Sequence, residues 1–154
     1  VPSAAAGSDA APIKIGRRAA SLRFLHTVHI AEDREAALVE AFKDPAYWAG
    51  IPLGEYRVVY ADGSVDRLPI LYPYNVMRWD TGDRIPYVLR SVGTLAGATE
   101  QMRRANPNGR DVCLYVAQWV NRKPDTVISH VELHGGTLGT PVLFAATGRA
   151  VAGE

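Results

Sequence analysis

The chain has 154 residues, of which 47% are hydrophobic and 21% are charged, a composition typical of a globular domain and not of a disordered segment. Its formal net charge is +1, from 17 basic and 16 acidic residues, which argues against a nucleic-acid-binding protein because such proteins normally carry a marked basic excess. The single cysteine excludes an internal disulfide framework and a cysteine zinc cluster, and no apolar run approaches the roughly 20 residues that a membrane helix needs.

The first residues of the chain, VPSAAAGSDAAP, have neither a basic n-region nor an apolar core of signal-peptide length. We interpret residues 1–12 as a flexible tail or linker, residues 13–150 as one domain, and residues 151–154 as a second tail. A leading segment of this kind could follow a cleaved signal or join two domains, and the sequence leaves both interpretations open.

The stretch SLRFLHTVHI, residues 21–30, is predicted to be a strand because it is rich in β-branched and aromatic residues. Side chains alternate between the faces of a strand, so His26 and His29 point to opposite sides and cannot chelate one metal ion as neighbours. His26 shares the apolar register with Phe24 and Val28. We therefore expect His26 to be a buried structural histidine with a hydrogen-bond partner.

The next stretch, AEDREAALVEAFKD, is rich in Ala, Glu and Leu and predicts a helix of about three turns over residues 31–44. The apolar residues that fall on one side at helical spacing are Ala37, Leu38, Ala41 and Phe42. We expect the helix to end at Asp44, because the residue before a proline avoids helical angles. A second short helix is the alternative considered for LAGATEQMRRAN, residues 95–106.

The stretch GEYRVVYADGSVDRLPI, residues 54–70, predicts a β-hairpin. Its first strand alternates the side chains of Tyr56, Val58 and Tyr60 with those of Arg57 and Val59. The turn contains Gly63, which can take a positive φ at no steric cost. Pro69, in the return strand, cannot donate to a ladder, so we expect it near a strand end or on an edge strand.

Three further strands are predicted in the second half of the chain, at DVCLYVAQWVN (111–121), TVISHVELHG (126–135) and TPVLFAATGRA (140–150). The first is a long apolar run suited to the middle of a sandwich, and we interpret Cys113 and Trp119 within it as buried core residues. These strands, the hairpin and the turns between them indicate an all-β sandwich or barrel.

A second pair of histidines lies in the strand 126–135. Alternation puts Ile128, His130, Glu132 and His134 on one face. His130 and His134 are about 13 Å apart along a strand, which is too far for both to bind one metal ion without ligands from neighbouring strands. We interpret this face as polar and exposed.

The sequence contains no phosphate-binding loop, no GxGxxG fingerprint, no HExxH motif and no GxSxG elbow. Aromatic residues in loops are more informative. An aromatic ring can cover the CH face of a sugar, while Asp, Asn or Arg side chains bond to its hydroxyls. The candidate contact residues are Trp79, Tyr74, Asn75, Asp80 and Arg78 in LYPYNVMRWD, with Trp48 in DPAYWAGIP as a second platform. The alternatives for Trp79 are a core plug and a contact to another protein.

Five stretches in this order resemble a known family: IGRRAASLRFLHTVHI, EYRVVYADGSVDRLPI, LYPYNVMRWD, LYVAQWVNRKPDTVISHVEL and TPVLFAAT. The chain is similar over most of residues 13–147 to the galactose-binding-like β-sandwich modules that accompany bacterial glycoside hydrolases. It departs from them in the charged helical insert 31–44, in Met77 and Arg78 where an acidic residue is typical, and in Arg122 where proline is usual.

The resemblance implies a two-sheet antiparallel jelly-roll-like sandwich, here with one or two short helices, which is usually non-catalytic and has ligand loops at one end. It also places His26 and Thr27 in a structural strand. Many folds of this type carry a structural calcium ion, although no oxygen-rich run in this sequence fixes one; we assign no other cofactor, no metal ligand and no catalytic residue.

The expected function is therefore that of a non-catalytic carbohydrate-binding or accessory module of an extracytoplasmic or secreted carbohydrate-active protein, with a polysaccharide or oligosaccharide as ligand. One alternative is a structural or interaction domain that packs against a catalytic domain or a second copy of itself. Another is a small polysaccharide hydrolase or lyase that uses carboxylates or histidines in a cleft. Neither nucleic acid nor a membrane is an expected partner.

Overall fold

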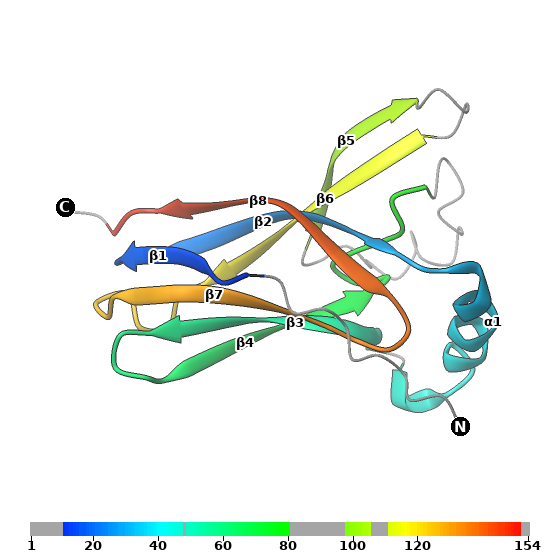
Figure 1. Ribbon diagram of the computed structural model, residues 1–154, viewed down its shortest axis with the longest axis horizontal. Coiled ribbons are helices and arrows are strands. Elements are labelled where there is room, and N and C mark those ends of the chain that lie inside the picture. Colours follow the sequence, from blue (N-terminus) through cyan, green and yellow to red (C-terminus); the bar gives the residue numbers. More distant parts are fainter. Residues whose placement is uncertain (1–10, 48, 81–97, 106–110, 152–154) are drawn as a thin grey trace.

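The computed structural model describes residues 11–47, 49–80, 98–105 and 111–151. For residues 98–105 and for residue 111 it describes the backbone but not the side chains. Two four-stranded antiparallel sheets are stacked face to face (Figure 1). Sheet A has the order β1-β7-β3-β4, which are Ile13–Arg17, Ile128–Gly135, Ile51–Tyr60 and Val65–Tyr72. Sheet B has the order β5-β6-β2-β8, which are Ala98–Ala105, Asp111–Val120, Ser21–His29 and Thr140–Arg149. The predicted all-β sandwich of two antiparallel sheets is confirmed.

The core lies between the sheets and follows the predicted alternation of β2 and β3. The buried side chains are Leu22, Phe24, His26 and Val28 on β2, and Tyr56, Val58 and Tyr60 on β3. The rings of Phe24 and Tyr56 stack across the two sheets, with centroids 4.1 Å apart and planes at 8°. Removing such rings from water is the main favourable term in holding two sheets together.

The predicted hairpin is confirmed as β3 and β4. Gly63 in its turn has a φ of 81°, a conformation that other residues rarely adopt. Pro69 lies in β4, which is the edge strand of sheet A, so its missing N–H interrupts no central ladder.

The predicted helix is α1, Glu32–Ala41, followed by a 3-10 turn at Pro45–Tyr47. Leu38 is its one buried residue, Ala41 packs partly against the core, and the Phe42 ring lies 5.9 Å from that of Tyr72 although Phe42 is itself exposed. Of the four apolar residues that fall on one side at helical spacing, Ala37 is exposed. No helix in the described parts of the chain is both long and apolar enough to cross a bilayer.

The second short helix considered for residues 95–106 is wrong, because Ala98–Ala105 is strand β5. It pairs antiparallel with β6, from Ala98 opposite Ala117 to Ala105 opposite Asp111. Pairing with a neighbouring strand here overrides the local preference of Glu, Gln, Met and Arg for helix.

A β-bulge in β7 changes the face on which Ile128 lies. Val59 of β3 pairs with His130, and the next residue, Tyr60, pairs with Ile128, so Ser129 is an extra residue in β7. The alternation shifts at this point, and Ile128 is fully buried. The placement of Ile128 on the same face as His130 is therefore wrong.

The end of the sandwich away from α1 is closed by polar contacts between the sheets. Tyr60 donates a hydrogen bond to Asn121 Oδ1 at 2.6 Å, and Asn121 Nδ2 donates to the carbonyl of Ala19 at 2.7 Å. The Trp119 indole N–H reaches Asp66 of β4 at 3.1 Å, and the Trp119 side chain is buried as predicted.

Candidate binding site in the segment 72–80

The segment 72–80 follows β4 at the α1 end of the sandwich and holds five of the six predicted contact residues (Figure 1). The sixth, Trp48, lies outside the described residues. The segment begins with a cis peptide bond between Tyr72 and Pro73, and the amide N–H of Tyr74 then donates to the Leu71 carbonyl at 2.7 Å. This turn directs the chain back towards sheet B.

Asn75 fixes the turn from within. Its Oδ1 accepts a hydrogen bond from the Leu71 amide and its Nδ2 donates to the Pro69 carbonyl, both at 2.8 Å. The residue is 6% exposed. Both ends of the amide are thus used by the backbone, which makes Asn75 a positioning residue of the segment.

His26 of β2 contacts the same turn from the core. Its Nε2 lies 2.9 Å from the Asn75 carbonyl, which can only accept, so Nε2 carries the proton. Its Nδ1 lies 2.9 Å from the Tyr56 hydroxyl, which therefore donates. The expected buried partner of His26 is confirmed, and there are two. Burial lowers the pKa of His26 from 6.5 to about 4.

Residues Met77–Trp79 form a short strand-like wedge between β2 and β6. The amide of Val28 donates to the Met77 carbonyl, the amide of Trp79 donates to Val28, and the amide of Cys113 donates to Trp79, at 3.3, 3.2 and 2.7 Å. Pairing of β2 with β6 ends at His26 opposite Tyr115, so the wedge occupies the place where these strands separate. Its backbone is fixed on both sides.

Arg78 links this wedge to α1. Its Nε and Nη2 donate to the two carboxylate oxygens of Asp80 at 2.9 and 3.0 Å, and its Nη1 donates to Glu35 of α1. The two carboxylates raise the pKa of Arg78, and the hydrogen bonds that Arg78 donates to Asp80 are the largest cause. Both acids are thus engaged by the same guanidinium.

Trp79 contacts a different residue. Its indole N–H points to Nδ1 of the exposed His29 across 3.4 Å, and its ring is half-buried. Tyr74 is 39% exposed. The structure therefore brings Arg78 and Asp80 together, and places Trp79 with His29 instead of with that pair.

The polar face of β7 is the second cluster of titratable groups. His130 Nε2 and His134 Nε2 lie 3.3 and 2.9 Å from the two carboxylate oxygens of Glu132. These contacts lower the pKa of Glu132, and the contact with His134 has the larger effect. All three side chains are partly exposed, as predicted. Among the described residues, no three His, Cys, Asp or Glu side chains are placed to hold one metal ion.

Two residues of the site were not found from the sequence. Glu35 lies more than forty positions from Arg78, and its helix carries other acids that look equivalent. Tyr56 is one of two inward tyrosines of β3, and only the pairing of the sheets shows that it bonds to His26. Neither residue has a local motif that would have indicated its role.

Comparison with known proteins adds no assignment: no family model, no curated protein and no solved structure matches this chain.

Proposed function

We propose that this chain is a non-catalytic carbohydrate-binding or accessory module of an extracytoplasmic carbohydrate-active protein. The observation that carries the proposal is the half-buried indole of Trp79 on a backbone that β2 and β6 hold from both sides. An aromatic ring fixed in this way loses little conformational entropy when it stacks on a sugar ring.

The groups around Trp79 suit the hydroxyls of a sugar. His29 is exposed and contacts the indole, and Tyr74 presents a phenol at the same end of the sandwich. Arg78 and Asp80 form a rigid donor and acceptor pair two residues apart. In this proposal Trp79 and Tyr74 contact the ligand, Arg78 and Asp80 lie at its rim, and Asn75 positions the segment.

The binding mode is weak and reversible. One stacked ring and a few directed hydrogen bonds give modest affinity, and attachment to a larger enzyme raises the effective concentration of the second binding event. The module would then keep a catalytic domain on its polysaccharide, and would act outside the cytoplasm, where such substrates are found.

Affinity electrophoresis on a panel of polysaccharides tests the proposal. The wild-type protein should be retarded by at least one polysaccharide, and Trp79→Ala should weaken that binding at least about tenfold, the usual effect of losing a central aromatic contact. Val65→Ala is the matched control, because it truncates an apolar side chain that is 48% exposed on β4, away from the segment 72–80. Thermal unfolding checks that each variant is folded, and Tyr74→Ala provides a second test if Trp79→Ala is not. Retardation by no polysaccharide would refute the proposal.

A second candidate is a structural domain that docks on a catalytic domain. It is favoured by Val39 of α1 and by Phe42 at the C-terminal end of this helix, whose side chains are 56% and 40% exposed. Exposed apolar side chains on one helix are typical of a protein contact. In this case Phe42→Ala would weaken docking, whereas Trp79→Ala would not.

A further inference from the structure

The four edge strands of the two sheets differ in charge. Charged residues occur within β1 (Lys14, Arg17), β4 (Asp66, Arg67) and β5 (Glu100, Arg103, Arg104). The fourth edge strand, β8, has no charged residue from Thr140 to Gly148 and ends on Arg149. Charges on an edge strand are a common protection against pairing with another chain. The edge of β8 lacks this protection over nearly its whole length.

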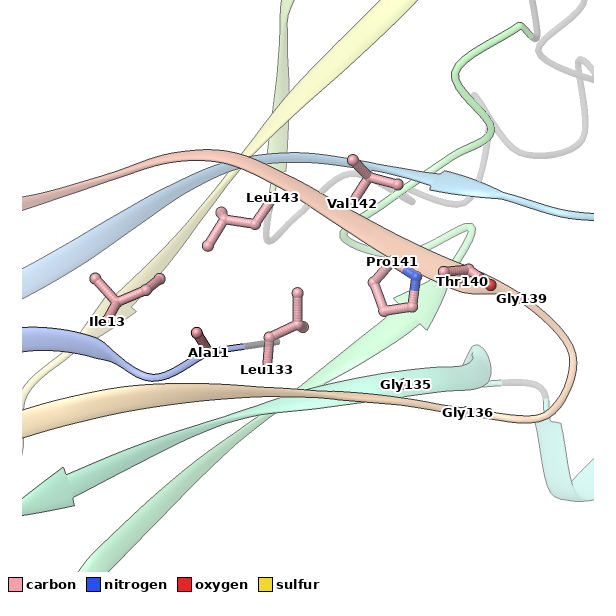
Figure 2. Close-up of a pocket in the computed structure, with 10 residues that line it drawn as sticks. All are labelled: Ala11, Ile13, Leu133, Gly135, Gly136, Gly139, Thr140, Pro141, Val142 and Leu143. Carbon is pink, nitrogen blue, oxygen red and sulfur yellow. The ribbon is translucent and has the colours of Figure 1, made fainter. Parts of the chain in front are cut away.

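The side chains of β8 are apolar on both of its faces. Val142 and Phe144 are 37% and 58% exposed on the outer side. Leu143 and Pro141 turn the other way, into a groove of about 370 Å³ between β8 and the start of β1 (Figure 2). A strand added beside β8 would extend sheet B over the mouth of this groove and cover the outer side chains.

The outer edge of β8 pairs with no strand of the described residues. One side of β8 is hydrogen-bonded to β2 from Arg149 opposite Ser21 to Thr140 opposite His29, and no described strand lies on its other side. The pairing with β2 shifts between Leu25 and His26, where Phe144 is the extra residue of a bulge. This bulge divides β8 into two regular halves without ending the strand.

We propose that β8 pairs antiparallel with β8 of a second copy of this chain, so that sheet B continues into the partner's sheet B across a two-fold axis. In this arrangement Arg149 lies opposite the partner's Thr140, and the two arginines are about 30 Å apart at opposite ends of the pair. No like charges face each other. Pairing of β8 with β1, β4 or β5 of another copy would bring it against charged strands and would leave further edges open, whereas the self-pairing closes.

Analytical ultracentrifugation over a wide concentration range tests this proposal. The wild-type protein should form a dimer. Phe144→Lys should raise the dissociation constant of this dimer at least about tenfold, because the two new positive charges approach each other near the two-fold axis. Val65→Lys is the matched control: Val65 is 48% exposed on the edge strand β4, and its substitution should leave the dimer unchanged. Thermal unfolding checks that both variants fold.

Cysteine cross-linking identifies the pairing strand independently. A single cysteine at Ala145 should form an interchain disulfide, because Ala145 lies next to the two-fold axis and close to its own copy. Single cysteines at Val142 and Thr147 should not, because in this register each lies opposite the other position and far along the strand from its own copy. The native Cys113 is buried, so the parent protein is the blank. A chain that is monomeric at every concentration, or a dimer that neither responds to Phe144→Lys nor cross-links through β8, would overturn the proposal. The proposed dimer does not depend on glycan binding. A negative result for dimerisation therefore does not refute the proposed function, and a negative result for glycan binding does not refute the dimer.

Discussion

His26 is the residue whose ionisation matters most for the fold, since it joins a strand of each sheet and the candidate site. Burial lowers its pKa from 6.5 to about 4, so the unfolded chain binds a proton that the folded protein resists. Its stabilising contribution is therefore complete above pH 6.5 and is lost as the pH falls from 6.5 to about 4. We expect urea unfolding to show a loss of about 3 kcal/mol over this range from this residue.

Two glutamine substitutions distinguish His26 from the other histidine of β2. His26→Gln should be less stable at pH 7 and should lose the pH dependence between 6.5 and 4. His29→Gln should retain that dependence, because His29 is exposed. An unchanged slope in His26→Gln would show that another group is responsible.

At the scale of elements, Arg78 is the tether between α1 and the wedge between β2 and β6. Its two carboxylate partners differ in exposure: the Asp80 side chain is 8% exposed and the Glu35 side chain 45%. Glu35→Gln should therefore cost less than about 1 kcal/mol, as for other exposed ion pairs. Arg78→Ala should cost more, because it removes a bidentate partner from a nearly buried carboxylate.

Hydrogen exchange shows where these effects occur. Loss of the tether should speed exchange in α1, which buries only Leu38, and leave the central strands β2 and β3 unchanged. Equal acceleration throughout the sandwich would contradict a local tether. Lys43→Gln is the matched control, because the contact of Lys43 with Glu40 stays within the α1 region.

The elements that the sequence predicted correctly are those with a strict local pattern. Tyr56, Val58 and Tyr60 alternate with Arg57 and Val59, and Gly63 marks the turn that follows. The errors lie where contacts between distant segments determine the conformation. Strand β5 takes its conformation from pairing with β6, and a bulge at Ser129 places the side chain of Ile128 on the opposite face of the sheet from the one predicted. The same limit applies to the site. Adjacency in the sequence grouped Trp79 with Arg78, but strand alternation sends their side chains to different partners, His29 and Glu35.

At the scale of the whole molecule, the two sheets are joined by polar contacts at both ends of the sandwich and by the stacked rings of Phe24 and Tyr56 in its core. His26, Tyr56 and Asn75 join them near the candidate site, and Tyr60, Asn121 and Trp119 join them at the far end. No buried side-chain nitrogen or oxygen among the described residues lacks a hydrogen-bond partner. Such fully satisfied contacts fix how the sheets sit on each other, because a shifted arrangement would leave buried polar groups unpaired.

The approach of β8 to β3 depends on a residue without a side chain. A Cβ atom on Gly54 would lie 2.3 Å from the His134 carbonyl oxygen and 3.1 Å from Pro141 of β8. The first neighbour is backbone and cannot turn aside. Gly54→Ala should therefore lower the free energy of unfolding by about 1–3 kcal/mol, the range for overpacking in a core, and by more because Gly54 also has a positive φ of 156°. Gly63→Ala is the matched control: it has a positive φ but no atom within 4 Å of the new Cβ, so we expect a loss of about 1 kcal/mol. Urea unfolding at pH 7 measures both, and equal losses would show that the close approach of Gly54 to the β7 backbone and to Pro141 of β8 does not require the glycine.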